Sequence, residues 1–267
     1  MKSLATSLAL ILAVAHLSSA ASLIVNPSKD NTIYAESSTL NGGGPLSNGL
    51  GVNFFAGNNG SSYARRALVV FDLSAIPAGA TIDSVSLQLY ATVAAAGAQT
   101  VSLHRITIAT NDYWGEGTSV ASGNGGGGAT ATTNDATWQD VKLLGQQWAT
   151  EGGDFVAISS ASTSVSGAGA AYTWSSAGLV SDVQAWVDGT ASNNGWIVIG
   201  NESDAGTAKG FASKDATTNK PQLTITYTVA VPEPATQALA LFAVLFLGWN
   251  TLSQRVSFAK AARRAGC

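Results

Sequence analysis

Alternation of apolar and polar residues is the feature that most restricts how this chain of 267 residues can fold. In residues 84–89 and 223–227, every second residue is apolar, and the residues between them are serine, threonine or glutamine. A period of two places the apolar set on one face of a β-strand. Two continuously apolar runs, 68–71 and 196–199, are typical of central strands that are buried on both faces. The sequence therefore predicts an all-β protein.

One segment has helical spacing instead. Apolar residues recur three and four positions apart between Leu179 and Val187, and Gly189 follows at the position of a C-terminal cap. We predict one short helix, residues 179–187, that covers an end of the β structure.

A second irregularity lies in residues 101–108. Val101 and Leu103 share one face of a predicted strand, whereas Ile106 and Ile108 have the opposite parity. A β-bulge between Leu103 and Ile106 would bring all four side chains to the same face. Between the strands, segments rich in glycine, serine, alanine and asparagine are predicted as long loops, namely residues 41–51, 122–134 and 159–171.

The N-terminus has the three parts of a secretory signal peptide. Lys2 supplies a positive charge, residues 4–14 are apolar, and residues 18–20 are small. The apolar part is too short to span a membrane. Cleavage is predicted after Ala20, so we assign residues 1–20 to a signal peptide and expect the folded part to be exported.

The C-terminal segment, residues 230–267, begins with a Pro-Glu-Pro motif. Pro232, Glu233 and Pro234 are followed by an apolar stretch, residues 238–249, and then by four basic side chains. A bilayer core takes about 20 apolar residues as a helix, so the span is marginal. The basic residues favour a cytoplasmic C-terminus, and an ordinary stop-transfer anchor is one interpretation of the segment.

The order of motif, apolar stretch and basic tail resembles the PEP-CTERM sorting signal of bacteria. That resemblance implies recognition by a membrane enzyme of the exosortase type. It also implies transient anchoring in the membrane through the C-terminal segment, and a final location at the cell surface or in the extracellular matrix.

Charge and cysteine content argue against nucleic-acid binding and against stabilisation by disulfides. The whole chain has a formal net charge of −3, and acidic residues outnumber basic ones in its middle part. Nucleic acid is therefore not an expected partner, because binding it requires a basic face. The single cysteine is the last residue, Cys267, so the exported part must be stabilised by its core without a disulfide.

Short phrases follow one another along the middle of the chain in a characteristic order. They occupy residues 30–34, 66–74, 76–82, 114–117, 136–138, 152–154, 183–189, 194–196 and 221–227. The series resembles the DNRLRE domains of secreted bacterial and archaeal proteins, although the middle loop is enlarged and residues 211–215 only approximate the family pattern. The resemblance implies a jelly-roll-like β-sandwich over residues 22–229. Some members of the family bind carbohydrate, including alginate, and others have no assigned ligand.

No catalytic constellation is apparent in the exported part. His104 is its only histidine, and it lies in a predicted strand without a cysteine partner. Glu116 and Asp112 are the nearest candidates for a pair of carboxylates that would cleave a glycosidic bond. No zinc-ligand spacing or phosphate-binding loop occurs, so we predict that the protein is not an enzyme.

Carbohydrate binding fits the residue types better. Tyr113 and Trp114 begin a glycine-rich loop, where exposed aromatic rings would stack on the apolar faces of sugars. Arg66, Arg105 and Lys214 are candidates for a cationic groove, since arginine forks suit the carboxylates of uronic acids. The alternative for each of these cations is an ion pair with a surface acid. Four other tryptophans are expected to pack in the core rather than bind sugar, namely Trp138, Trp148, Trp186 and Trp196.

A structural calcium ion is a further candidate, since oxygen ligands from acidic residues suit this ion. Asp30, Asp72 and Asp154 lie near predicted strand ends, but no EF-hand loop or similar motif occurs. The sequence therefore predicts no cofactor beyond such a calcium ion.

The overall hypothesis is an exported, non-enzymatic surface protein that binds or organises extracellular, acidic polysaccharide. A purely structural or adhesive surface protein is the first alternative. A polysaccharide lyase or hydrolase on the same scaffold is the second.

Overall fold

Strands make up most of the regular structure in the computed structural model, which describes residues 18–108 and 113–230. The prediction of an all-β protein is confirmed, and only one α-helix occurs in these ranges. The strands are β1 (Ser18–Val25), β2 (Pro27–Tyr34), β3 (Leu46–Ser47), β4 (Asn53–Asn58), β5 (Ala64–Phe71), β6 (Thr81–Ala94), β7 (Gln99–Arg105), β8 (Ala129–Thr130), β9 (Ala161–Val165), β10 (Ala170–Ser175), β11 (Trp196–Ile199), β12 (Lys209–Ala212) and β13 (Gln222–Ala230). The helices are η1 (Ala35–Ser37), a 3-10 turn, and α1 (Ala177–Val187).

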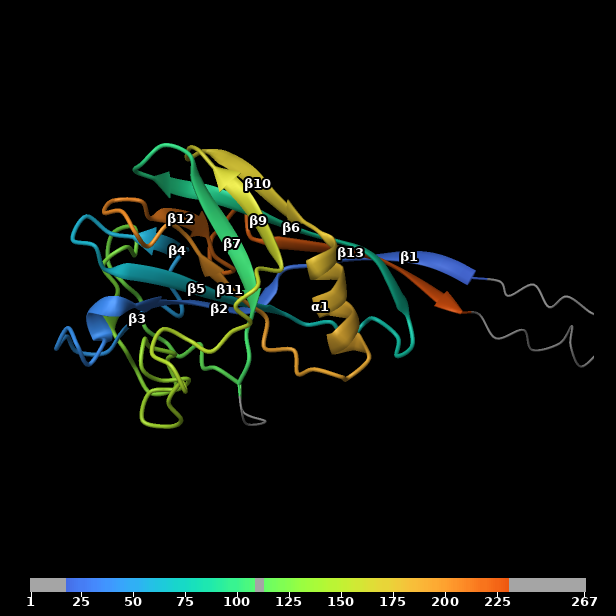
Figure 1. Ribbon diagram of the computed structural model, residues 1–267, viewed down its shortest axis with the longest axis horizontal. Helices are drawn as coiled ribbons and strands as arrows, with labels where there is room; N and C mark the ends of the chain where they lie inside the picture. Colours follow the sequence, from blue (N-terminus) through green and yellow to red (C-terminus); the bar gives the residue numbers. More distant parts are fainter. Residues whose placement is uncertain (1–17, 109–112, 231–267) are drawn as a thin grey trace, which may run out of the picture. The chain divides into compact units, whose positions relative to one another are not determined.

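One curled sheet contains 11 of these strands in the order β1-β13-β6-β12-β4-β5-β11-β7-β9, with β10 paired to β6 and β2 paired to β5 (Figure 1). The long strand β6 organises one half of the sheet, because β13 and β12 share one of its edges and β10 occupies the other. Strand β4 pairs with both β12 and β5, so it joins this half to the half formed by β2, β5, β11 and β7. The short strands β3 and β8 pair separately.

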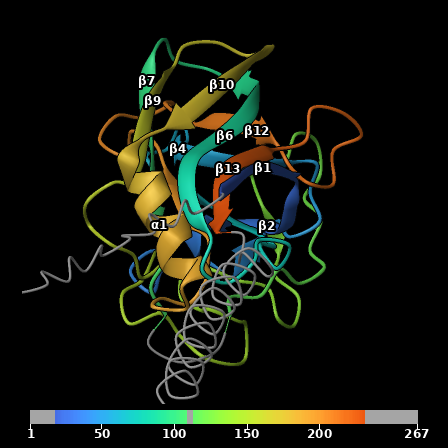
Figure 2. The same cartoon turned by 90° about the vertical axis from the view of Figure 1, so that its right-hand side faces the viewer.

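The main core lies between the two halves of the curled sheet. Alternate residues of β6, such as Leu87 and Leu89, are fully buried there and face Val69 of β5 and Trp196 of β11 within one cluster. Helix α1 packs beside β6 and closes part of this core (Figure 2). The period-two alternation predicted for residues 84–89 and 223–227 therefore reflects one buried face of β6 and of β13.

A second core covers the outer face of β5 and β11. Leu68 and Ile197 point away from the main core and pack with Trp114, Trp138 and other side chains from the long connection between β7 and β9. Both faces of these two strands are thus buried. This confirms the interpretation of the apolar runs 68–71 and 196–199 as central strands.

The second core also shows that the predicted bulge between Leu103 and Ile106 is wrong. Strand β7 pairs with β11 in continuous register from Ser102 to Arg105, without a shift. Val101 and Leu103 belong to the main core, whereas Ile106 belongs to the second one. The change of parity arises because the two faces of the strand are buried by different sets of residues.

The predicted loop over residues 159–171 is also wrong in part. It contains β9 and the first residues of β10, and β9 pairs with β7 along its whole length. Ala161 and Val165 are buried in the main core. Alanine and serine make up three of the five residues of β9 and give the strand no clear sequence signal, so its pairing with β7 and its burial decide its conformation.

The helix prediction is confirmed, with α1 beginning two residues earlier than expected. Ser176 is the N-cap, and its Oγ accepts a hydrogen bond from the N–H of Leu179 at 3.1 Å. Leu179, Val183 and Trp186 form the buried face. Gly189 ends the helix with a φ of +68°, a conformation that glycine adopts without strain.

Residues 1–17 of the predicted signal peptide and residues 231–267, with the motif Pro232, Glu233 and Pro234, lie outside the described residues. Among the residues that are described, no helix has the length and apolar character needed to cross a membrane.

Candidate functional site

Arg66, the first of the predicted binding cations, is already bound to an acid of the same chain. Its guanidinium donates two hydrogen bonds of 2.8 Å to the two oxygens of Glu202 and a third, also 2.8 Å, to the carbonyl of Gly152. The guanidinium also lies over the rings of Trp138 and Phe155, at 4.8 and 5.4 Å from their centroids. The Arg66 guanidinium therefore already binds a carboxylate of the same chain and packs against aromatic rings.

Arg105 and Lys214 are also paired, and the three cations do not form one groove. Arg105 Nε lies 3.4 Å from Asp182, and Lys214 Nζ lies 3.3 Å from Glu116. Arg66 packs on the outer face of the sheet, whereas Arg105 has the parity of Leu103 and belongs to the inner face. The ion-pair alternative considered for each cation is what the structure shows.

The two predicted aromatic contacts differ in exposure. Tyr113 is 53% exposed, whereas Trp114 is only 1% exposed and belongs to the second core. The expectation that Trp114 is available for stacking is therefore wrong. Its indole N–H donates to the carbonyl of Asn194 at 2.8 Å, which fixes the segment that presents Tyr113.

Tyr113 borders a surface hollow of about 420 Å³. Its lining residues are Ser28, Lys29, Val70, Phe71, Asp72, Tyr113, Trp114, Asn193 and Asn194. Asn194 is 4% exposed, and its Oδ1 has no hydrogen-bond partner among the described residues. A buried amide oxygen without a donor is costly unless a ligand or a water supplies one. The hollow thus combines an exposed aromatic ring with an unsatisfied acceptor.

A second hollow of about 300 Å³ adjoins the first, since Asp72 and Asn193 line both. Its other lining residues are Leu73, Ser74, Ile76, Ala78, Trp186 and Val187. The indole N–H of Trp186 is buried and has no acceptor in the described part of the chain. The two hollows, which we call the Tyr113 groove, are therefore lined by one residue with an unsatisfied buried acceptor and one with an unsatisfied buried donor.

The three acids predicted as metal ligands do not converge. Asp72 is exposed, and its pKa is lowered by hydrogen bonds from Ser74. Asp154 accepts the backbone N–H groups of Ala149 and Thr150 at 2.8 and 2.9 Å, so it closes a local turn. Only Asp30 lies in a group of acids that could share one ion.

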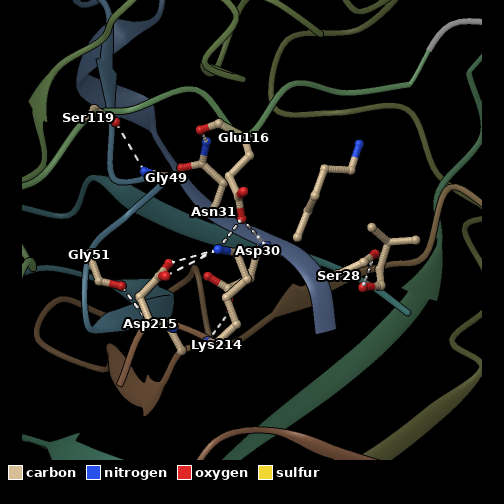
Figure 3. A network of polar contacts seen from close by, with 12 residues as sticks. Ser28, Asp30, Asn31, Gly49, Gly51, Glu116, Ser119, Lys214 and Asp215 are labelled. Carbon is tan, nitrogen blue, oxygen red and sulfur yellow. Dashed lines mark hydrogen bonds and ion pairs between the residues drawn. The ribbon is translucent and has the colours of Figure 1, made fainter. Parts of the chain in front are cut away.

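That group, which we call the carboxylate cluster, consists of Asp30, Glu116 and Asp215 (Figure 3). One oxygen from each residue lies within 4.8 Å of the others. Lys214 Nζ lies 3.1 Å from both oxygens of Asp215 and 3.3 Å from Glu116. The backbone N–H of Lys214 donates to Asp30 Oδ2 at 2.6 Å, and the N–H of Asp30 donates to Glu116 at 2.9 Å.

Burial controls the ionisation of the carboxylate cluster. It raises the pKa of Asp30 from 3.8 to about 8 and also raises the pKa of Glu116. Burial alone would lower the pKa of Lys214, but the contacts with Asp215 and Glu116 outweigh it and raise that pKa. The sequence had indicated Asp30, Glu116 and Lys214 separately and for different roles, and Asp215 was not among the predicted site residues.

The raised pKa of Asp30 predicts that the protein loses stability as the pH rises from about 4 to about 8. Over that range Asp30 keeps its proton in the folded state but has lost it in the unfolded state. The free energy of unfolding therefore falls by up to about 1.4 kcal/mol for each pH unit. Urea unfolding at several pH values in this range, with EDTA present, gives the free energy of unfolding at each pH. This free energy should fall less steeply with pH for Asp30→Asn than for the unchanged chain. Parallel profiles for the two proteins would contradict this prediction.

The candidate catalytic residues have structural contacts. The ring nitrogens of His104 lie 2.9 Å from the carbonyl of Val156 and 3.2 Å from Ser102 Oγ, and its ring packs edge-on against Phe155. Glu116 is held in the carboxylate cluster, and Asp112 lies outside the described residues.

In comparisons with known proteins, the chain matches no family model and no curated protein.

Proposed function

We propose that this protein is an exported, non-enzymatic β-sandwich of jelly-roll type that binds polysaccharide in the Tyr113 groove and so binds or organises extracellular matrix. The observation that carries the proposal is that one hollow is lined both by the exposed ring of Tyr113 and by Asn194, whose buried Oδ1 has no partner among the described residues. A sugar offers both complements, an apolar face for the ring and hydroxyl donors for the oxygen.

The size and shape of the groove support a chain-like ligand. The two hollows, of about 420 and 300 Å³, are each within the range of small-molecule sites. Because they share Asp72 and Asn193, consecutive sugar units of one polymer can occupy both. The unsatisfied N–H of Trp186 in the second hollow would then bind a ring or hydroxyl oxygen.

Lys29 is the residue that supports a preference for acidic polysaccharide. Its Nζ lies 5.6 Å from the centroid of the Tyr113 ring and donates to the carbonyl of Trp114 at 2.9 Å. A carboxylate of a uronic acid stacked on Tyr113 would therefore lie close to this ammonium. Arg66, Arg105 and Lys214 do not line the Tyr113 groove, so the cationic groove expected from the sequence does not enter the proposal.

Replacement of Tyr113 by alanine tests the proposal. Affinity electrophoresis in gels that contain alginate, with a neutral glucan as a second polymer, should show retardation of the unchanged chain. The Tyr113→Ala variant should bind at least about tenfold more weakly, equivalent to about 1.4 kcal/mol, because the stacking platform is lost.

Ile158→Ala is the matched control, since Ile158 is 82% exposed and lines neither hollow. It should bind as the unchanged chain does. Absence of retardation by every polymer, or equal loss in the two variants, would favour the purely structural or adhesive alternative. Shortening of the polymer during long incubation would favour a lyase or hydrolase.

The cellular location of the protein is a separate part of the proposal. The signal-like N-terminus and the Pro232-Glu233-Pro234 segment support export, sorting by an exosortase-type enzyme and transient contact with the membrane. Mass spectrometry of the mature protein from its native cell should find an N-terminus at Ala21 and a C-terminus before the basic tail. Intact termini in cytosolic protein would contradict export.

A further inference from the structure

A buried oxygen of Asp30 has no hydrogen-bond partner among the described residues. Asp30 is 1% exposed, and its Oδ2 accepts the N–H of Lys214, whereas its Oδ1 accepts nothing in that part of the chain. A carboxylate oxygen removed from water in this way destabilises the fold unless a proton or a cation binds it. This oxygen therefore points to a missing partner of positive character.

The surroundings of this oxygen have the geometry of an ion site. Asp30 comes from β2, Glu116 from the connection after β7, and Asp215 from the turn after β12. One oxygen from each lies within 4.8 Å of the others, and two ligands of one calcium ion at 2.3–2.6 Å lie at most about 5 Å apart. The three carboxylates can therefore reach one ion without a change of backbone.

The ammonium of Lys214 marks where positive charge is stabilised, at 3.1 Å from Asp215 and 3.3 Å from Glu116. When all three carboxylates are ionised, one ammonium neutralises only one of them, and a proton or a cation must balance the others. The side chain of Lys214 is 19% exposed, and its long stem allows the ammonium to turn outward to water. A divalent ion in its place would then bring two positive charges to the three carboxylates instead of one.

We propose that Asp30, Glu116 and Asp215 form a calcium site, and that the ammonium of Lys214 occupies it in the ion-free protein. An all-oxygen set of carboxylates matches calcium, whereas zinc prefers nitrogen and sulfur ligands and magnesium retains most of its water in octahedral geometry. Waters complete the six to eight ligands that calcium takes.

The ion joins the connection after β7 to the sheet. Glu116 lies three residues from Tyr113, and Asp30 follows Lys29, so bound calcium restricts the segment that forms one wall of the Tyr113 groove. Calcium binding does not depend on whether that groove holds sugar. Loss of one activity is therefore distinguishable from loss of the other.

Isothermal titration of the full chain with CaCl₂ at pH 8, after removal of ions with EDTA, tests the site. We expect one ion per chain, with a Kd within or below the range of about 0.1 to 1 mM seen in extracellular modules, and weaker binding of MgCl₂. The thermal midpoint should rise with calcium, since the ion binds only the folded state. Asp215→Asn should weaken calcium binding at least about tenfold, whereas Asp83→Asn, an exposed acid outside the cluster, should leave it unchanged.

Lys214→Met separates this proposal from a purely structural ion pair. The variant keeps the apolar stem and removes the competing ammonium, so calcium should bind more tightly than to the unchanged chain. The same variant is destabilised without calcium and recovers when calcium is added. Absence of binding heat and of any thermal shift up to about 10 mM calcium, in both the unchanged chain and Lys214→Met, would overturn the proposal.

Discussion

Replacing Trp196 by alanine is expected to lower the free energy of unfolding by about 3–5 kcal/mol, a large part of the 5–15 kcal/mol typical of a folded protein. Trp196 is fully buried on the central strand β11, and its ring lies 4.7 Å from that of Trp186 and 6.2 Å from that of Phe71. The indole N–H also donates to Asp182 at 2.8 Å. The truncation therefore leaves a cavity and removes a donor from a partly buried carboxylate.

Trp196→Phe is the matched control, since it keeps a ring in the core and removes only the N–H and part of the volume. It should cost about 1–2 kcal/mol. Urea unfolding followed by circular dichroism gives both values. An unchanged slope of unfolding free energy against urea concentration would show that the variants differ in stability and not in the surface that unfolding exposes. A loss below about 1 kcal/mol for Trp196→Ala would mean that β11 is not central to the core.

Gly195→Ala is expected to prevent stable folding or to cost more than about 4 kcal/mol. Gly195 has a φ of +75°, and a Cβ at this position would lie 2.0 Å from the carbonyl oxygen of Val69 on β5. The methyl group cannot be accommodated unless β11 moves away from β5, which would open both cores at once.

Gly189→Ala isolates the part of this effect that comes from backbone conformation. Gly189 has a similar φ of +68°, but nothing lies within 4 Å of the position of its Cβ. Only the strain of the left-handed conformation applies, about 1–2 kcal/mol. Equal losses of unfolding free energy in the two variants would contradict the close approach of β5 and β11.

Local patterns were enough to predict the helix and several of the strands of the main core, namely parts of β5, β6, β7, β11 and β13. The alternation in residues 84–89 records a strand with one buried face, and the apolar runs record strands with two. Strand β9 escaped prediction because its buried residues, Ala161 and Val165, are separated by serine and threonine with no distinctive period. The bulge was predicted wrongly because sequence parity does not show that a second core lies on the other face of β7.

The candidate site was harder to predict because its contacts join distant parts of the chain. Arg66 binds Glu202, 136 positions away, and nothing near Arg66 in the sequence indicates this partner. Trp114 was expected at the surface because glycines surround it, but the connection that carries it folds onto β5 and β11. An acid directly after Lys214, namely Asp215, is a weak signal that could have directed attention to the carboxylate cluster.

The pairing of β1 with β13 has a consequence for how the protein reaches its native state. The first and the last described strands are neighbours, and β13 also completes the edge of β6. Such distant partners make folding slow, because a large loop must close before the contacts form. When the chain emerges gradually, N-terminus first, β1 and β6 therefore lack their common neighbour β13 until the end of the chain is free. Until then their unpaired edges must be protected from aggregation.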